Sequence, residues 1–173
     1  MADFTHFTHD GRPQMVNVGE KAETSRKAIA TGQVFVQAAT LSAVREGGLK
    51  KGDAVAIMMP NLLQYPVAMF GILRAGMVVV NVNPLYTARE LKHQLNDANA
   101  KAIVIVENFA CTLEEVIADT NLKDVYLTAL GDMLPAPKRW VVNAMVKYVK
   151  KMVPSFNLSD TTSFMSAVRK PLF

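Results

Sequence analysis

The stretch AVAIMMPNLLQYPVAMFGILRAGMVVVNVNP, residues 54–84, decides the fold of this chain. It begins with an apolar run, passes through a segment with apolar residues at helical spacing, and ends with a second apolar run closed by Pro84. Runs that are apolar throughout are typical of strands covered on both faces, and two parallel strands need a helical crossover between them. Residues 54–84 therefore predict a strand, helix, strand unit of a parallel sheet.

A second helix is predicted directly after this unit, in TARELKHQLNDAN, residues 87–99. Thr87 and Glu90 have the spacing of a capping box, in which each side chain accepts a hydrogen bond from the backbone of the other residue. Leu91 and Leu95 lie four residues apart and share one helical face. The segment is therefore expected to return the chain across the sheet.

Three further segments continue the alternation of strand and helix. Residues 101–106, KAIVIV, predict a strand, residues 108–120 a helix and residues 124–130 a strand. Strands that alternate with helices of this length are typical of a doubly wound sheet with helices on both faces. The predicted fold class is α/β, with a partial doubly wound parallel sheet over residues 54–130.

The first 53 residues have a different character, because their apolar positions are sparse. Short strands are predicted in QMVNV and QVFVQ, and a brief helix in ATLSAVREGG. These segments offer little apolar surface from which to build a core. We expect residues 1–53 to form a leader that packs poorly on the sheet.

A separate amphipathic helix is predicted in KRWVVNAMVKYVKKMVP, residues 138–154, after a linker at residues 131–137. On a helical wheel its apolar side chains share one face: Val141, Val142, Met145, Val146, Val149, Met152 and Val153. Its basic side chains are Lys138, Arg139, Lys147, Lys150 and Lys151. The chain therefore divides into a leader (1–53), an α/β segment (54–130) and a C-terminal segment (131–173).

The basic helix has two interpretations. In the first it is an ordinary surface helix whose valine stripe packs on the sheet. In the second it lies on an anionic membrane surface. The residues that would carry this contact are Lys138, Arg139, Trp140, Lys147, Lys150 and Lys151. A nucleic-acid partner is not expected, because one helix face is too apolar and the basic residues are not interleaved with aromatic ones.

The amino-acid composition limits the classes of protein to which this chain can belong. Half of the residues are apolar, the net charge is +4, and a single cysteine, Cys111, excludes an intrachain disulfide. The N-terminus lacks the pattern of a signal peptide, and Arg74 and Asn81 interrupt the apolar runs too early for a membrane span. The expected location is the cytoplasm, with a peripheral position on the inner membrane under the lipid interpretation of the helix.

The sequence holds few candidates for catalysis. It contains neither G-x-x-x-x-G-K-[ST] nor G-x-G-x-x-G, so no phosphate-binding loop is predicted. His6 and His9 have a spacing that suits two metal ligands, but no further ligand follows, and His93 is expected on a helix surface. Cys111 is expected to be a small core residue. We therefore expect no metal site and no bound cofactor in this chain.

A resemblance to a known family extends from Leu49 to about Ala167. It is carried by LKKGDAVAIMMPNLLQYPVAMFGILRAGMVVVNVNPLYTARELKHQLNDANAKAIVIVENFA, then LGDML and VVNAMVKYVKKMVP. These residues resemble the bacterial long-chain fatty acid:CoA ligases of the adenylate-forming superfamily. The resemblance implies ATP, Mg²⁺ and CoA as cofactors and co-substrates, and an acyl-adenylate intermediate. It covers part of the large N-terminal domain and implies that the catalytic motifs lie downstream, so that this fragment is inactive alone.

A second resemblance covers residues 7–53. The motif M-V-x-V-x-x-K-x-x-T-x-R begins at Met15, and K-G-D begins at Lys51. Both are similar to the N-terminus of cyclic pyranopterin monophosphate synthase of molybdenum cofactor biosynthesis, although Asn17 replaces that family's usual Asp. The resemblance implies a pterin precursor as substrate and a catalytic role for Lys51. The residues that would act with Lys51 in that family are not found in this sequence.

Both families pass through GLKKGD, so the chain reads as a chimera joined at Leu49–Asp53. An accidental fusion is favoured over a bifunctional protein, because neither half holds a complete site. Three functions follow as hypotheses: a fragment of a fatty acid:CoA ligase, a synthase-like protein, and a non-catalytic module that binds a membrane surface.

Overall fold

The computed structural model describes residues 48–169, which belong to the second of two compact units, Val34–Phe173. The predicted strands and helix of the leader, and the pair His6 and His9, lie outside the described residues.

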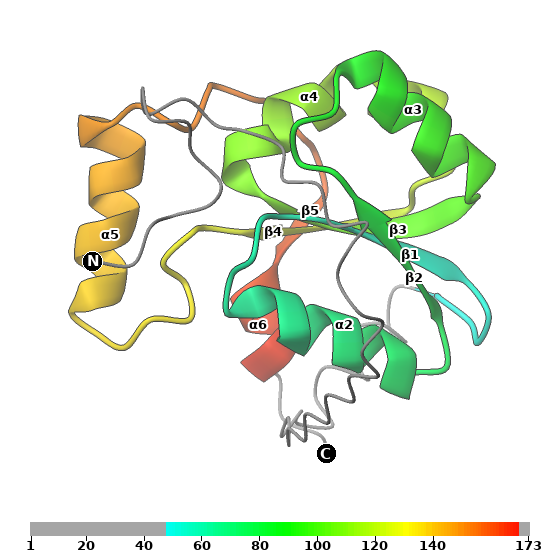
Figure 1. Cartoon of the computed structure of the whole chain (residues 1–173), viewed down its shortest axis with the longest axis horizontal. Helices are drawn as coiled ribbons and strands as arrows, with labels where there is room; N and C mark the ends of the chain where they lie inside the picture. The colour runs from blue at the N-terminus through cyan, green and yellow to red at the C-terminus, as the bar shows by residue number, and fades with distance from the viewer. Residues whose placement is uncertain (1–47, 170–173) are drawn as a thin grey trace, which may run out of the picture. The chain divides into compact units, whose positions relative to one another are not determined.

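Five parallel strands form one sheet in the order β2-β1-β3-β4-β5 (Figure 1). The strands are β1 (Ala54–Met58), β2 (Val78–Val82), β3 (Ala100–Val106), β4 (Asp124–Thr128) and β5 (Thr161–Ser163). The chain runs outward from β1 to β2, returns to β3 on the other side of β1, and continues outward to β4 and β5. This reversal between β1 and β3 is the topology of a doubly wound sheet, so the predicted α/β class is confirmed.

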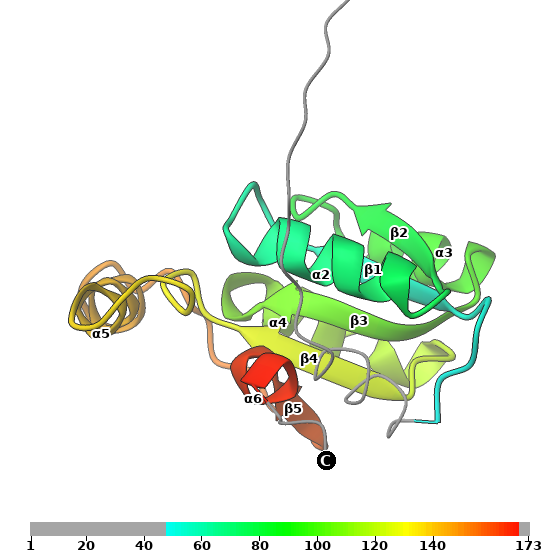
Figure 2. The ribbon, with the colours of Figure 1, turned by 90° about the horizontal axis from the view of Figure 1, so that it is seen from below.

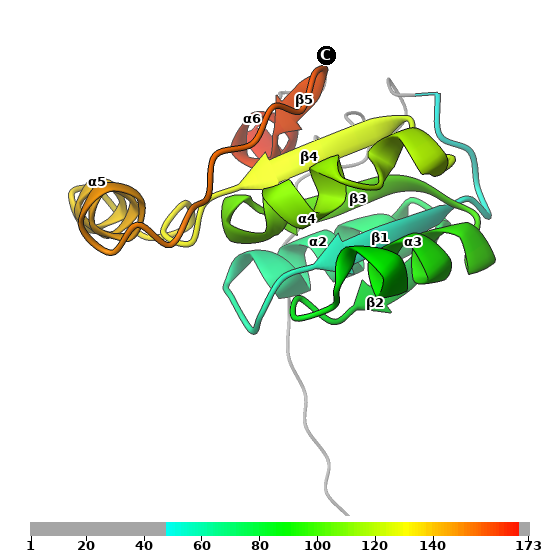
Figure 3. The same cartoon turned by 90° about the horizontal axis from the view of Figure 1, so that it is seen from above.

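Helices cover both faces of the sheet. The α-helices are α2 (Gln64–Arg74), α3 (Ala88–Asp97), α4 (Ala110–Glu114), α5 (Lys138–Ala144) and α6 (Phe164–Arg169). Shorter turns are η1 (Glu107–Phe109) and η2 (Ile117–Asp119), both 3-10 helices, and η3 (Met145–Val149), a π-helix. α2 and α6 lie on one face of the sheet (Figure 2), and α3 and α4 lie on the other (Figure 3).

The burial of β1 on both faces explains why successive residues of this strand are apolar. Val55 and Ile57 join the buried cluster beneath α2, whereas Ala56 and Met58 join the cluster beneath α3. All four side chains are at most 2% exposed. Because a strand alternates its side chains between faces, a strand covered twice has no place for a polar residue. The sequence pattern that predicted a parallel sheet has this physical origin.

The predicted helix at residues 108–120 is wrong in its extent. The α-helical part is α4 alone, with η1 before it and η2 after it. The backbone N–H groups of Val116, Asp119 and Thr120 donate to carbonyls three residues earlier, which winds this part of the chain into tighter turns. The C-terminal strand β5 and helix α6 were not predicted. The three residues of β5 are all exposed, so they carry no apolar alternation to detect.

No helix in the range 48–169 is long and apolar enough to cross a membrane.

The capping box at the start of α3 is confirmed. The Thr87 Oγ1 atom accepts a hydrogen bond from the Glu90 backbone N–H at 3.4 Å, and the Thr87 N–H donates to Glu90 Oε2 at 2.9 Å. The hydrogen bonds from the backbone and side chain of Thr87 lower the pKa of the Glu90 carboxyl. Leu91 and Leu95, which follow on the inner face, are fully buried. The cap therefore begins the helix that covers β1 and β3.

We expect Thr87→Ala to lower the free energy of unfolding by about 1 kcal/mol, because the first turn of α3 loses its side-chain acceptor. Thr87→Ser keeps the hydroxyl and should lose much less. Urea unfolding followed by circular dichroism measures both variants. Equal destabilisation by the two substitutions would show that the methyl group of Thr87 matters and that the cap does not.

Candidate functional site

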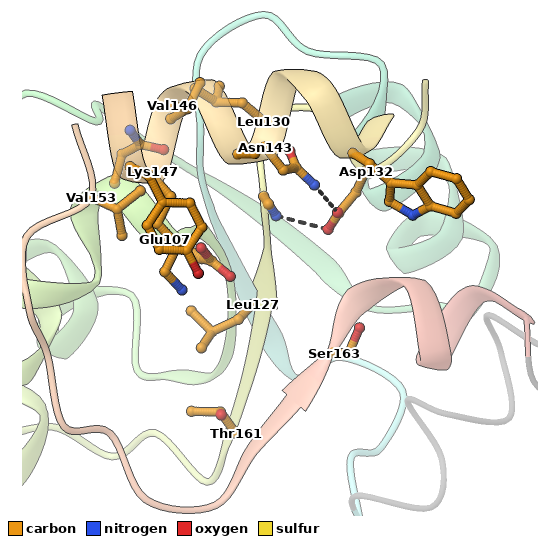
Figure 4. A pocket seen from close by; sticks show the side chains of 15 residues that line it. Glu107, Leu127, Leu130, Asp132, Asn143, Val146, Lys147, Val153, Thr161 and Ser163 are labelled. Atoms are coloured by element: carbon orange, nitrogen blue, oxygen red, sulfur yellow. Dashed lines mark hydrogen bonds between the residues drawn. The ribbon is translucent and has the colours of Figure 1, made fainter. Parts of the chain in front are cut away.

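A cavity of about 660 Å³ opens at the carboxyl edge of the sheet. Its walls come from the residues after β3 and β4, from α5 and η3, and from β5 (Figure 4). Polar groups among them include Glu107, Asp132, Asn143, Lys147 and Ser163. Open α/β sheets place their ligand sites at this edge, because all parallel strands end there. The cavity is therefore the candidate site of the described residues.

A buried hydrogen-bond network lies at this carboxyl edge of the sheet. Gln64, the first residue of α2, is 1% exposed, and its Nε2 donates to Thr128 Oγ1 at 3.3 Å and to the Ala129 carbonyl at 2.8 Å. Thr128, also 1% exposed, donates from Oγ1 to Asp132 Oδ2 at 3.1 Å. Buried polar groups are costly unless they are paired, so these bonds fix the end of β4 against α2.

The same network continues into α5 through a single amide. Asn143 Nδ2 donates to Asp132 Oδ1 at 3.0 Å (Figure 4). Asn143 Oδ1 accepts from the Gly131 N–H at 2.8 Å. A Cβ atom on Gly131 would lie 2.7 Å from Asn143 Oδ1 and 3.1 Å from the Arg139 carbonyl oxygen, so a side chain there would displace Asn143. Gly131 therefore permits the close approach that attaches α5 to the loop after β4.

A second attachment lies at the other end of the basic helix. Asn108 Nδ2 donates to the Met152 carbonyl at 2.8 Å, which ties the residues after η3 to the end of β3. Between these two attachments the helix borders the cavity with Asn143, Val146 and Lys147. The position of the basic helix thus depends on a few polar contacts.

The sequence patterns did not single out Gln64, Thr128, Asp132 and Asn143. Two signals were present. Gln64 is a polar residue in a largely apolar helix, and Thr128 follows three apolar-patterned positions at the end of a strand. A buried polar residue at a strand end indicates a hydrogen-bond partner nearby, although the sequence alone does not say which residue that is.

Lys51, the residue implied by the synthase resemblance, is exposed in the turn before β1. Its side chain passes over Gly76, with its Cγ 3.1 Å from the place of a Cβ there. Because all strands are parallel, this turn lies at the amino edge of the sheet and the cavity at the carboxyl edge. The structure does not bring Lys51 together with the cavity residues.

Metal ligands are not grouped in the described part of the chain. Residues 48–169 contain no cluster of three His, Cys, Asp or Glu side chains suited to a metal ion. His93 is exposed on α3, and Cys111 is half-buried on α4.

The predicted membrane-surface residues all lie on or next to α5 and η3. Five of them are exposed: Lys138, Trp140, Lys147, Lys150 and Lys151. Arg139 is half-buried, and its Cζ lies 5.8 Å from the centre of the Trp140 ring. The valine stripe does not pack on the sheet as one unit, because Val142 and Val146 are half-buried while Val141 and Val149 are exposed.

Comparison with known proteins places this architecture in a family. A model of the AMP-binding enzyme family matches residues 23–166. A long-chain-fatty-acid–CoA ligase of Salmonella typhimurium is 56% identical over 159 residues, which cover 91% of this chain and 27% of the ligase. The chain thus spans about a quarter of the length of that curated relative.

A second relative is of another kind. A cyclic pyranopterin monophosphate synthase of Thermoanaerobacter pseudethanolicus is 31% identical over 155 residues, covering 86% of this chain and 92% of the synthase. The identity to the ligase is much higher over a stretch of similar length.

Among solved structures, a long-chain-fatty-acid–CoA ligase of Archaeoglobus fulgidus has a TM-score of 0.51 at 24% identity, covering 60% of this chain and 20% of the ligase. At this identity the likeness concerns the fold, and it agrees with the parallel sheet described above. The match of the family model over most of the sequence is the stronger finding, and by it the chain belongs to the AMP-binding enzyme family.

Proposed function

We propose that this chain forms part of a long-chain-fatty-acid–CoA ligase, to which it contributes a doubly wound parallel sheet. The observation that carries the proposal is the 56% identity to the Salmonella typhimurium ligase over 159 residues. The whole reaction would activate a fatty acid with ATP to an acyl-adenylate, releasing pyrophosphate. The thiol of CoA would then attack the acyl carbon and release AMP.

The described residues do not fit a metal–nucleotide complex. Both carboxylate oxygens of Asp132 already accept hydrogen bonds from Thr128, Ala129 and Asn143, which leaves this carboxylate committed to the fold. Glu107 is the other acid that lines the cavity. With Asp132 committed, the cavity-lining residues offer no pair of carboxylates to a metal ion. No step of the reaction is therefore assigned to a residue of this chain.

The proposed role of the chain in the ligase is architectural. Reactions at phosphate need fixed donors aimed at the developing charge, and removing a single such donor costs about 2.7 to 4 kcal/mol in well-studied enzymes. The 173 residues contain no phosphate-binding loop motif. Their contribution is a rigid sheet edge, fixed by the Gln64 to Asn143 network, against which further elements of a ligase can pack.

We expect a hybrid ligase to be active when residues 49–167 of this chain replace the corresponding segment of the Salmonella typhimurium ligase. The reason is that the buried core residues of the sheet and the Gln64 to Asn143 network should pack correctly against the rest of that enzyme. The assay measures AMP and acyl-CoA after addition of ATP, Mg²⁺, CoA and a long-chain fatty acid.

Two controls sharpen this test. The 173-residue chain alone should form no acyl-CoA above a heat-treated sample, since the phosphate-binding motif is missing from its sequence. A hybrid with Asn143→Ala should be less active than the parent hybrid. A folded hybrid without any acyl-CoA formation, or turnover by the isolated chain, would contradict the proposal.

A second candidate function rests on the leader. The match to the pyranopterin synthase supports a synthase-like character for part of this chain, but it covers 86% of the chain and therefore does not locate a joint at Leu49–Asp53. The match of the AMP-binding family model already begins at residue 23, inside this leader, and it stands against a joint as late as Leu49.

We expect the purified chain to form no pyranopterin from the cyclised GTP-derived precursor. Lys51 is exposed in a turn, away from the cavity, and an isolated lysine lacks the proximity effects that supply roughly 7 to 11 kcal/mol in oriented reactions. Turnover that disappears on Lys51→Ala would show a working synthase site. For the chimera itself, continuous reads of the source DNA across the codons for Val44 to Pro60 would exclude a false join.

A further inference from the structure

Strand β2 lies at one end of the sheet. Within residues 48–169 it pairs with β1 and with no other strand (Figures 2 and 3). The Val78 N–H donates to the Asp53 carbonyl at 3.0 Å, toward β1. Successive residues of a strand direct their backbone groups to opposite sides, so the N–H and C=O groups of Val79 and Asn81 point away from the sheet. β2 therefore presents outward-facing backbone groups at the edge of the described structure.

The sequence of β2 lacks the usual protection of an edge strand. The strand reads VVVNV, and residues 75–88 contain no Asp, Glu, Lys or Arg. Val78 is 51% exposed. Uncharged, β-branched segments without Pro are the ones that pair most readily with another chain. The strand at the other end of the sheet, β5, differs because it has only three residues, all polar, and short edge strands pair poorly.

A side chain of α3 covers one of the outward groups of β2. Gln94 Nε2 donates to the Asn81 carbonyl oxygen at 2.9 Å. The other amide atom, Gln94 Oε1, is buried and has no hydrogen-bond partner in the described part of the chain. An unpaired buried acceptor is destabilising. The amide thus lies against the edge of β2 even though its oxygen is unpaired, which indicates that the contact has a role at the edge itself.

A second side chain holds Asn81 from the opposite face of the sheet. Tyr65 Oη donates to Asn81 Oδ1 at 2.9 Å. Tyr65 belongs to α2 and Gln94 to α3, and these helices cover opposite faces (Figures 2 and 3). Asn81 is therefore bonded from both helix layers, through its side-chain oxygen and its backbone oxygen.

A second copy of the chain fits this edge. Two copies related by a two-fold axis would bring their β2 strands together antiparallel. With Val79 of each copy opposite Asn81 of the other, each Val79 N–H would donate to the Asn81 carbonyl that Gln94 occupies. Pairing would not extend to Met77, whose N–H already donates to the Ile72 carbonyl at 3.1 Å. Gln94 and a second copy therefore need the same acceptor.

We propose that Gln94 blocks antiparallel pairing of β2 with a second copy of this chain. Its amide occupies the acceptor that pairing requires, and it takes the place of the charge or proline that protects other edge strands. No charge on β2 opposes the approach of two such strands, so loss of the amide turns β2 into a self-association edge.

The test compares the whole chain with Gln94→Ala by size-exclusion chromatography and light scattering over a range of concentrations. We expect the variant to associate at about tenfold lower concentration, because the hydrogen bond that competes with pairing is lost from both strands. Gln94→Ser is equally unable to reach Asn81 and should behave in the same way, so a folding defect in one variant leaves the test intact.

Hydrogen exchange identifies where the copies meet. The outward N–H groups of Val79 and Asn81 should exchange quickly in the monomer and become protected in the associated variants. Adding Val78→Lys to Gln94→Ala places a charge at an exposed position of the edge and should restore the behaviour of the unaltered chain.

Asn96→Ala is the matched control. Asn96 is also an amide side chain of α3, and its Nδ2 donates to the Asp119 backbone carbonyl at 3.0 Å, outside the sheet. The substitution removes an equivalent bond from the same helix and should leave association unchanged.

Three results would overturn the proposal. The first is association of both Gln94 variants at the same concentration as the unaltered chain. The second is equal association of Asn96→Ala, which would assign the effect to a weakened α3. The third is an associated Gln94 variant whose Val79 and Asn81 amides stay unprotected, because the copies would then meet elsewhere.

Discussion

The burial of β1 and β3 on both faces is the constraint on which the rest of the structure depends. Every side chain from Val55 to Met58 is at most 2% exposed, and β3 alternates between the same two clusters. A strand pair in this position needs a covering helix on each face, which requires the crossovers that α2 and α3 provide. The capping box at Thr87 and the apolar face of α3 are consequences of this requirement.

At the carboxyl edge the strands end, and polar contacts replace apolar ones. The network from Gln64 through Thr128 and Asp132 to Asn143 joins α2, which is 64 residues away in the sequence from its partner Thr128, to β4 and α5. Its outer member, Asn143, places α5 beside the cavity and leaves the other side of the helix in water. The side of α5 that lines the cavity and the side left in water are therefore set by this attachment, together with the Asn108 to Met152 hydrogen bond beyond η3.

The sequence was sufficient to predict the structure wherever a local pattern of residues determines it. The three apolar runs of β1, β2 and β3 and the capping box are such patterns. It was insufficient where the structure depends on contacts between distant residues. Strand β5 is exposed and is a strand only because it pairs with β4, and Asn143 belongs to the site only because Asp132 and Gly131 lie next to it. The valine stripe looked uniform in sequence, yet the attachment through Asn143 turns Val142 inward and Val149 outward.

The most direct test compares hydrogen exchange in the native chain and in Asn143→Ala. It asks whether the Asn143 side chain holds α5 in place, and whether the sheet stays stable without that contact. The account predicts the slowest exchange in β1 and β3. It also predicts that Asn143→Ala speeds exchange in residues 138–149 by about tenfold, because two hydrogen bonds are lost, and leaves β1 and β3 unchanged. Asn157→Ala, at an exposed position, should change neither region. Equal acceleration in α5 and in β1 and β3, or none in α5, would contradict the account.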